Sequence, residues 1–194
     1  PSIKNLLPDI QAFKPSVLLV VPRVLEKVYN AASSKAGGGI KGRMFAWSAK
    51  QARTFSVASE KTFGPGLFKK MRHGIADALV LKKIRSVLGP NLRYIVSGGA
   101  PLATDLAHFY AGMGITLIQG YGLSETTGPI SVQHIGKNPV GGVGLPLPGN
   151  FIKIAKDGEI LVRGQSVMPG YYHLPEQTAE VMPDGKWFHT GDLG

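Results

Sequence analysis

The sequence predicts an α/β fold, in which part of a parallel sheet with flanking helices is followed by a small β subdomain. A strand–helix–strand pattern between residues 92 and 120 has the length of a right-handed crossover between parallel strands. The continuous apolar run at 17–21 is typical of a strand in such a sheet. After Pro129 the pattern changes to short strands separated by Gly and Pro, which indicates the β subdomain.

The first 90 residues are expected to contain one strand and several helices. Residues 1–13 are expected to form a loop with a short helix, and Val17 to Val21 a buried parallel strand. Pro22 then begins a helix, because the first turn of a helix leaves its N–H groups without partners and proline has none. Apolar residues at helical spacing between glycine breaks predict helices at 22–35, 41–62 and 67–88.

The next segment is expected to carry strands at 92–96 and 115–120, with a helix at 102–112 between them. Thr104 and Asp105 suit the first turn of that helix. In open parallel sheets, ligands bind beyond the carboxyl ends of the strands. The loops that follow these two strands are therefore the expected place for a ligand.

The last segment is expected to form the small β subdomain. Strands at 151–154 and 159–163 flank an Asp-Gly pair, which is a strong signal for a β-hairpin. A short helix is expected at 175–182. The boundary is placed so that residues 1–139 form the α/β subdomain and residues 140–194 the β-rich one.

The composition indicates a globular protein of 194 residues, long enough to bury a sizeable core. The absence of cysteine excludes a disulfide framework and a Cys-based zinc site. No apolar run approaches the ~20 residues of a membrane span, and no signal-peptide pattern is present. The expected location is the cytoplasm.

The net charge of +10 is unevenly distributed. Residues 1–90 carry 16 Lys and Arg against 4 Asp and Glu, and many of the cations lie between residues 41 and 85. Solvated helix faces are one explanation of this basic region, and peripheral contact with an anionic membrane is another. Nucleic acid is not expected, because no base-stacking aromatic residues alternate with the cations.

The run GYGLSETTG at 120–128 predicts a nucleotide site. The ring of Tyr121 can stack on a flat base, and the hydroxyl of Ser124 can donate to a phosphoryl oxygen. Glu125 supplies a carboxylate of the kind that Mg²⁺ prefers. Gly120 and Gly122 allow the backbone to approach a ligand closely. The alternative is a glycine-rich turn in which the glutamate is incidental.

Two further runs fit the same chemistry. Ser97-Gly98-Gly99-Ala100-Pro101 follows the strand expected at 92–96, and its small residues leave room for a planar ring against the backbone. The run at 184–192 ends on Gly191-Asp192, and an Asp after a strand suits the hydroxyls of a ribose. A solvated Asp in an ordinary turn is the alternative for this second run.

In this order and spacing, the three runs resemble those of the adenylate-forming superfamily, which includes acyl-CoA synthetases, peptide-synthetase adenylation domains and luciferases. The resemblance covers essentially the whole chain. Within the superfamily, the chain is most similar to the long-chain fatty acid–CoA ligase branch. The segments that carry it are KPSVLLVVPRVLEKVY (14–29), LVLKKIRSVLGPNLRYIVSGGAPL (79–102), VGLPLPG (143–149), ILVRGQSVMPGYYHLPEQTAEVM (160–182) and WFHTGDLG (187–194).

The resemblance implies a role for each motif residue. Tyr121 would stack on adenine, and Asp192 would bind the ribose hydroxyls. Ser124 would contact the α-phosphate and Glu125 would coordinate Mg²⁺, which makes these two the expected catalytic residues. Many family members carry Thr where this chain has Ser124, and the hydroxyl is kept in both. The other residues expected at the nucleotide are Gly98, Gly99, Ala100, Pro101, Gln119, Gly120 and Gly122.

The implied reaction has two steps. A fatty acid reacts with ATP to give an acyl-adenylate and pyrophosphate, and CoA then takes the acyl group and releases AMP. Such enzymes also have a phosphate loop, a second ribose-binding residue and a catalytic Lys, none of which is found in this chain. The sequence is therefore expected to be an internal fragment of the large N-terminal domain, and to be inactive by itself.

Two alternatives remain open at this point. A fatty acyl-AMP ligase would form the same adenylate but load it onto a carrier protein. A noncatalytic binding or membrane-docking module would use only the basic helices and would have no affinity for nucleotide.

Overall fold

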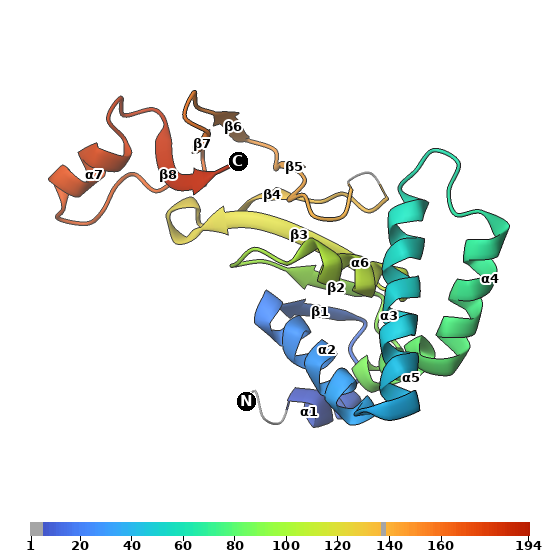
Figure 1. Cartoon of the computed structure of the whole chain (residues 1–194). Helices are drawn as coiled ribbons and strands as arrows, with labels where there is room; N and C mark the ends of the chain where they lie inside the picture. The colour runs from blue at the N-terminus through green and yellow to red at the C-terminus, as the bar shows by residue number, and fades with distance from the viewer. Residues whose placement is uncertain (1–5, 137–138) are drawn as a thin grey trace. The chain divides into compact units, whose positions relative to one another are not determined.

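The computed structural model describes residues 6–136 and 139–194, which form two compact units. The first unit comprises residues up to Gln119 together with 135–142, and the second comprises 120–134 together with 143–194 (Figure 1). The part of the expected N-terminal loop at 1–5 lies outside the described residues. No helix within the described ranges is long and apolar enough to cross a bilayer.

A parallel sheet forms the centre of the first unit. The strands β1 (Val17–Val20), β2 (Tyr94–Ser97) and the first half of β3 (Thr116–Leu123) lie side by side in that order. Both pairings are parallel, with Val17 opposite Tyr94 and Tyr94 opposite Thr116. The predicted strand–helix–strand crossover and the parallel sheet are therefore confirmed.

The prediction that β1 is buried is wrong. Val17 is 52% exposed and Leu19 is 77% exposed, whereas Leu18 and Val20 pack against the core. Successive side chains of a strand point to opposite faces of the sheet, and in β1 only the face that carries Leu18 and Val20 packs against the core. A continuous apolar run does not distinguish this arrangement from a strand that is covered on both faces.

Helices surround this sheet, and their positions match the sequence predictions to within a few residues. The predicted helix at 67–88 is continuous but contains a π-helical segment in its middle, where the backbone changes its hydrogen-bond spacing. The helical elements of the first unit are α1 (Leu6–Phe13), α2 (Pro22–Ala36), α3 (Gly39–Ser59), α4 (Leu67–Ala76), η1 (Asp77–Leu81), α5 (Lys82–Leu88) and α6 (Thr104–Gly112).

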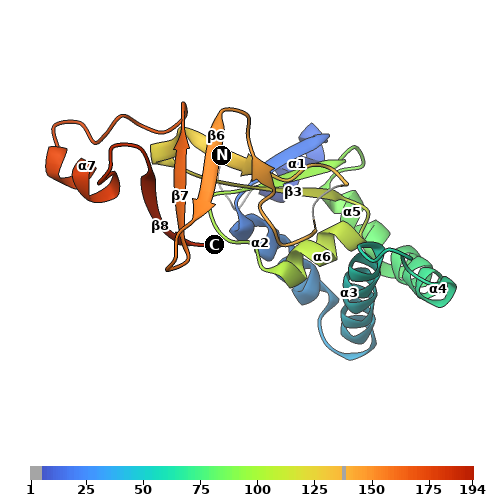
Figure 2. The same cartoon turned by 90° about the horizontal axis from the view of Figure 1, so that it is seen from above.

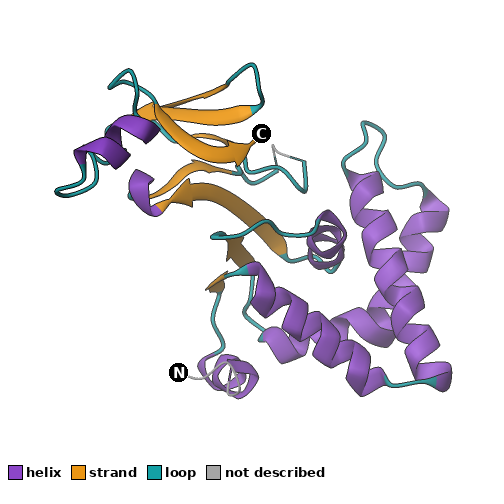
Figure 3. Ribbon diagram, turned by 60° about the vertical axis from the view of Figure 1, so that its left-hand side comes forward, coloured by secondary structure: helices purple, strands orange, loops and turns teal. Residues whose placement is uncertain are grey.

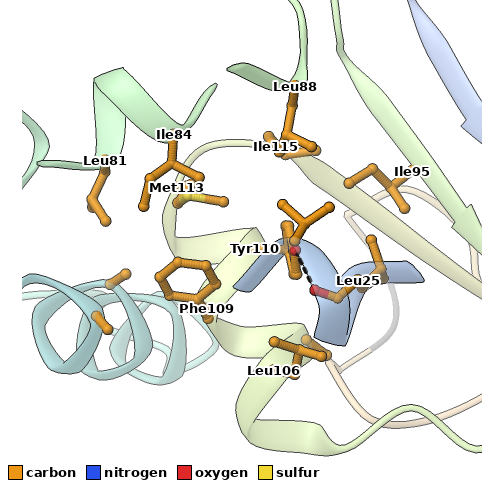
Figure 4. Packing of buried hydrophobic residues seen from close by; sticks show 14 of the residues in the cluster. Leu25, Leu81, Ile84, Leu88, Ile95, Leu106, Phe109, Tyr110, Met113 and Ile115 are labelled. Atoms are coloured by element: carbon orange, nitrogen blue, oxygen red, sulfur yellow. Dashed lines mark hydrogen bonds between the residues drawn. The ribbon is translucent and has the colours of Figure 1, made fainter. Parts of the chain in front are cut away.

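The core of the first unit lies between α6, α2 and the sheet (Figure 4). Phe109 and Tyr110 of α6 are fully buried, as is Ile95 of β2. The phenol of Tyr110 donates a hydrogen bond of 2.8 Å to the main-chain oxygen of Leu25, also fully buried. This bond joins α6 to α2 and satisfies the one polar atom of the Tyr110 side chain.

The second unit consists mainly of strands (Figure 3). The second half of β3 pairs antiparallel with β4 (Gly128–Val132), and β4 pairs with the short β5 (Leu145–Pro146). Figure 2 shows a second sheet, in which the strands β6, β7 and β8 lie side by side. The remaining elements of this unit are β6 (Asn150–Ile154), β7 (Glu159–Gly164), α7 (Pro175–Val181) and β8 (Phe188–Leu193). The predicted hairpin and short helix are confirmed.

Candidate functional site

The strand β3 continues through the glycine-rich motif and ends only at Leu123. The sequence predicted that this strand ends at about Gly120. Pairing with β4 prolongs it, with a bulge between Tyr121 and Gly122. A Cβ atom at Gly122 would lie 2.1 Å from the main-chain oxygen of Gly128, so the antiparallel strands can approach this closely only with glycine at 122.

A short 3₁₀ turn, η2 (Ser124–Thr126), follows the strand. The hydroxyl of buried Thr126 closes this turn: it accepts the N–H of Leu123 at 2.8 Å and lies 2.8 Å from the main-chain oxygen of Gly128. Because Thr126 points inward, Ser124 is exposed and Glu125 is only half-buried. The turn therefore presents a hydroxyl and a carboxylate on adjacent residues.

The Glu125 residue is held at both its side chain and its main chain. Its Oε1 atom accepts a 3.0 Å hydrogen bond from the phenol of Tyr171. Its main-chain oxygen accepts a 2.7 Å bond from the N–H of Met168. The hydrogen bond to the Glu125 carboxylate raises the pKa of the Tyr171 phenol. Tyr171 is not among the site residues that the sequence predicted.

The predicted base-stacking and ribose-binding residues lie next to each other. The phenol of Tyr121 donates a 2.7 Å hydrogen bond to Oδ2 of Asp192 on β8. Burial of the phenol and, to a smaller extent, the Asp192 carboxylate raise the pKa of Tyr121 to about 12, against the opposing effect of a hydrogen bond with Thr190. The backbone on both sides of this contact is held as well: Gly191 N–H donates to Oε1 of Glu159 at 2.9 Å, and Asp192 N–H to Oγ1 of Thr190 at 3.1 Å.

The Glu159 carboxylate has a second contact that sequence reasoning missed. Its Oε2 atom lies 2.8 Å from Nδ1 of His189 on the neighbouring strand β8. The contact of His189 helps to hold the start of the Gly191-Asp192 segment. Only the pairing of β7 with β8 could have revealed it, because the two residues are 30 positions apart.

The segment Gly98 to Pro101 belongs to the first unit, where it connects β2 to α6. Its Gly99 has a positive φ of 78°, which favours glycine. Just before this segment, Ser97 pairs in register with Gln119. Ser97 is 2% exposed, and its hydroxyl has no hydrogen-bond partner among the described residues. An unsatisfied buried hydroxyl at the carboxyl end of a parallel strand is compatible with a ligand site in this loop.

A cavity of about 600 Å³ in the first unit lies away from all the predicted site residues. Its walls include Ile115, Thr116 and Leu117 at the amino end of β3, together with Phe55 and Glu60 from the region of α3. Because ligands of parallel sheets bind at the opposite, carboxyl ends, this cavity does not mark the nucleotide site.

Comparison with known proteins places these features in a family. The sequence matches the model of the AMP-binding enzyme family over residues 1–172, which is most of the chain. The chain belongs to the AMP-binding enzyme family. The side chains described above therefore belong to a member of this family; they are Tyr121, Ser124, Glu125 and Asp192.

Curated relatives of this AMP-binding chain include named long-chain ligases. It is 50% identical over 192 residues to the long-chain-fatty-acid–CoA ligase FadD15 of Mycobacterium bovis, covering 99% of the chain and 32% of that protein. It is 35% identical over 209 residues to the long chain acyl-CoA synthetase 3 of Arabidopsis thaliana, covering 99% of the chain and 30% of that protein. The chain thus spans about a third of the length of these relatives.

Solved structures support the same fold at lower identity. The O-succinylbenzoate coenzyme A synthetase of Bacillus subtilis, in complex with ATP and magnesium ion, aligns with a TM-score of 0.58 at 21% identity, over 100% of this chain and 32% of that one. An anthranilate CoA ligase in complex with anthranoyl-AMP aligns with a TM-score of 0.59 at 21% identity, over 98% of this chain and 29% of that one. At these identities the likeness concerns the fold of the AMP-binding chain.

Proposed function

We propose that this chain is part of an ATP-dependent long-chain fatty acid–CoA ligase. The observation that carries the proposal is the 50% identity to a long-chain-fatty-acid–CoA ligase over 99% of the chain. In the proposed reaction the fatty carboxylate attacks the α-phosphorus of ATP, pyrophosphate leaves, and an acyl-adenylate forms. The thiolate of CoA then attacks the acyl carbon and AMP leaves. The proposed location is the cytoplasm.

The contact between Tyr121 and Asp192 supports their assignment to the adenosine part of ATP. In a nucleoside the base and the ribose are directly bonded, so the groups that bind them must lie close together. The 2.7 Å contact satisfies this requirement. Because the Tyr121 phenol uses its hydroxyl edge for Asp192, the ring face remains available for stacking on adenine. The second carboxylate oxygen of Asp192 can accept a ribose hydroxyl.

The adjacent Ser124 and Glu125 are the proposed catalytic residues. The exposed hydroxyl of Ser124 can donate to the α-phosphate, and the carboxylate of Glu125 fits Mg²⁺, which prefers carboxylate and phosphate oxygens. The donor to Glu125 is a neutral phenol, which adds no positive charge that would compete with a cation. When bound, the metal would neutralise charge on the phosphates during their displacement.

The other proposed nucleotide-binding residues have backbone roles. The small residues between β2 and α6 are proposed to lie against the adenine, and the glycines of β3 to allow close approach of the backbone. These residues, with the buried Gln119, are Gly98, Gly99, Ala100, Pro101, Gly120 and Gly122.

Acid-dependent ATP–pyrophosphate exchange by the complete ligase tests the proposal, with acids from acetate to palmitate. Exchange that increases with chain length is expected. Glu125→Ala should lower kcat/KM by about 10²–10³-fold, the usual effect of deleting one electrostatic contact to the transition state. Exchange only with short or aromatic acids would overturn the long-chain assignment, and wild-type kcat/KM in Glu125→Ala would overturn the role of the carboxylate.

The acceptor of the acyl group is tested separately. CoA is the proposed acceptor, and the alternative is the pantetheine of a carrier protein. Formation of acyl-CoA by the complete ligase is expected, and acylation of a carrier protein alone would replace CoA with that acceptor. We also propose that the isolated 194-residue chain is inactive, so its exchange rate should equal that of its Glu125→Ala variant.

We propose, in addition, peripheral contact with anionic membranes through the basic 41–85 region. Within this region, helix α4 is the element best suited to contact a membrane. Its apolar residues Leu67, Phe68 and Met71 are 85%, 64% and 56% exposed. The adjacent positions Lys69 and Lys70 carry positive charge. An exposed apolar stripe beside cations is typical of a helix that lies at the surface of an anionic bilayer.

Co-sedimentation of the complete ligase with vesicles tests this contact. Binding to vesicles containing phosphatidylserine should exceed binding to neutral vesicles and should weaken with salt. Phe68→Ser should weaken binding, whereas Tyr172→Ser, at an 87% exposed aromatic residue of the second unit, should not. Binding that ignores anionic lipid and salt would overturn the proposal. A chain that binds vesicles but shows no affinity for nucleotide would instead be a noncatalytic docking module.

A further inference from the structure

The segment 166–171 is attached to the turn that carries Glu125 by three hydrogen bonds. The Tyr171 phenol donates to Oε1 of Glu125 at 3.0 Å, and Met168 N–H donates to the main-chain oxygen of the same residue at 2.7 Å. Two residues further along, just after the turn, the hydroxyl of Thr127 donates to the main-chain oxygen of Ser166 at 2.8 Å. The Met168 bond holds the main chain of the turn, and only the Tyr171 bond acts on the carboxylate itself.

The position of Tyr171 is itself imposed by the elements around it. Its N–H donates a 2.9 Å hydrogen bond to Oγ1 of Thr178 in α7. The preceding Gly170 has a φ of 153°, and a Cβ atom there would lie 2.7 Å from Cγ2 of Thr178. Glycine at 170 therefore allows the chain to pass close to α7, and this fixes the backbone from which the Tyr171 ring extends.

We infer that Tyr171 is a positioning residue, whose phenol orients the Glu125 carboxylate for a divalent cation bound with ATP. The inference rests on the proposed function, because it assumes that Glu125 binds the metal. A ligand carboxylate that is held by a hydrogen bond loses less rotational freedom when the cation binds, and such supporting contacts typically change affinity by about 10–100-fold. A phenol is suited to this task, since it donates one bond and adds no positive charge to compete with the cation.

The raised pKa of Tyr171 is consistent with this geometry, because a phenol beside a carboxylate retains its proton. Asp192 is held in the same way by Tyr121, so each of the two proposed ligand carboxylates receives one tyrosine hydroxyl.

The decisive experiment compares Tyr171→Phe with wild type in the complete ligase, using ATP–pyrophosphate exchange at varied Mg²⁺. The expected result is a rise of about 10-fold in the Mg²⁺ concentration that gives half-maximal rate, within the range for supporting contacts. The KM for the fatty acid should stay unchanged. Tyr172→Phe is the matched control, because it removes a hydroxyl from the neighbouring 87% exposed residue and should leave both values unchanged.

A second measurement detects the bound metal without activity. Calorimetric binding of Mg²⁺ in the presence of ATP and the absence of fatty acid should be weaker in Tyr171→Phe than in wild type, because the Glu125 carboxylate is no longer held. Tyr172→Phe should bind Mg²⁺ as wild type does. If the wild type is active and Tyr171→Phe has an unchanged Mg²⁺ requirement, the positioning role is overturned. If the wild type itself is inactive, the proposed function is overturned. A lower melting temperature of Tyr171→Phe, together with the rise in its Mg²⁺ requirement, would show a structural role only and would also overturn the inference.

Discussion

The hydroxyl of Tyr121 lies 2.7 Å from the carboxylate of Asp192, 71 positions further along the chain. The bond joins the end of β3 to β8, so it brings together two predicted site residues that are far apart in the sequence of the second unit. Glu125 is bonded in the same manner by Tyr171 at 3.0 Å. Each of the two carboxylates therefore accepts a hydrogen bond from an uncharged donor, which does not compete with a cation or a ribose hydroxyl by charge.

The first prediction separates the two functions of Tyr121. Tyr121→Phe removes one hydrogen bond, usually about 1 kcal/mol, and should raise the KM for ATP of the complete ligase less than about 10-fold. Tyr121→Ala also removes the ring, and base–aromatic stacking contributes about 1–3 kcal/mol, so its KM should rise by a further factor of about 5 to 150. Steady-state kinetics at varied ATP give both values. Equal KM values for the two variants would contradict stacking on Tyr121.

The second prediction concerns alkaline pH. Burial raises the pKa of Tyr121 to about 12, whereas a phenol in an unfolded chain has a pKa of about 10. Between these values the unfolded chain has lost a proton that the folded chain retains, so the free energy of unfolding falls as pH rises. Below about pH 10 both states are protonated and Tyr121 adds no pH dependence.

Urea unfolding at several pH values between about 9 and about 12 measures this effect. The fall in stability should be smaller in Tyr121→Phe than in wild type, because the variant has no phenol at this position. Burial also raises the pKa of Tyr110, whose contribution has the same sign and remains in the variant. Identical slopes for the two proteins would refute the raised pKa of Tyr121.

The secondary structure could be predicted from the sequence because its signals are local. Glycine breaks and helical apolar spacing gave the helices of the first unit, and the Asp-Gly pair gave the hairpin of β6 and β7. The exposure of Leu19 could not be predicted, since it depends on which face of β1 the core covers. The predicted end of β3 was also wrong, because the last residues of the strand are held by pairing with β4.

The site could be predicted only as a set of residue types. Tyr121, Glu125 and Asp192 carry chemistry that is visible in the sequence, but their contacts depend on tertiary structure. Tyr171 gave no signal, because a tyrosine after Pro-Gly is equally compatible with a packed turn. Its contact with Glu125 requires the 166–171 segment to pass beside η2, which the local sequence does not determine.

The third prediction concerns the hydrogen bond between α6 and α2. Tyr110→Phe removes the 2.8 Å bond to the main-chain oxygen of Leu25 without leaving a cavity (Figure 4). The variant should lose about 1 kcal/mol of stability, the usual net contribution of one hydrogen bond. Urea unfolding gives the value, and Tyr172→Phe at an exposed position should show no loss. A loss in Tyr110→Phe no larger than in this control would contradict the prediction.

The fourth prediction concerns the crossing of α3 and α6. A Cβ atom at Gly112 would lie 2.0 Å from the main-chain oxygen of Ala52 and 2.4 Å from its carbonyl carbon. These are atoms of the α3 backbone, so no side-chain rotation can relieve the clash and the helices must separate. The main-chain oxygen of Gly112 also accepts a 2.6 Å hydrogen bond from Nε2 of His73, which a shift of α6 would weaken.

Gly112→Ala should therefore destabilise the protein by about 1–3 kcal/mol or more, since this range is typical of overpacking. Gly74 provides the matched control, because it lies within the continuous helical stretch that begins with α4, and a Cβ atom there would have no atom within 4 Å. Gly74→Ala should stabilise the protein by about 0.5–1 kcal/mol, since alanine loses less backbone entropy in a helix than glycine does. The urea midpoints should thus move in opposite directions from wild type. Midpoints that both rise would show that α3 and α6 have room for a methyl group at their crossing.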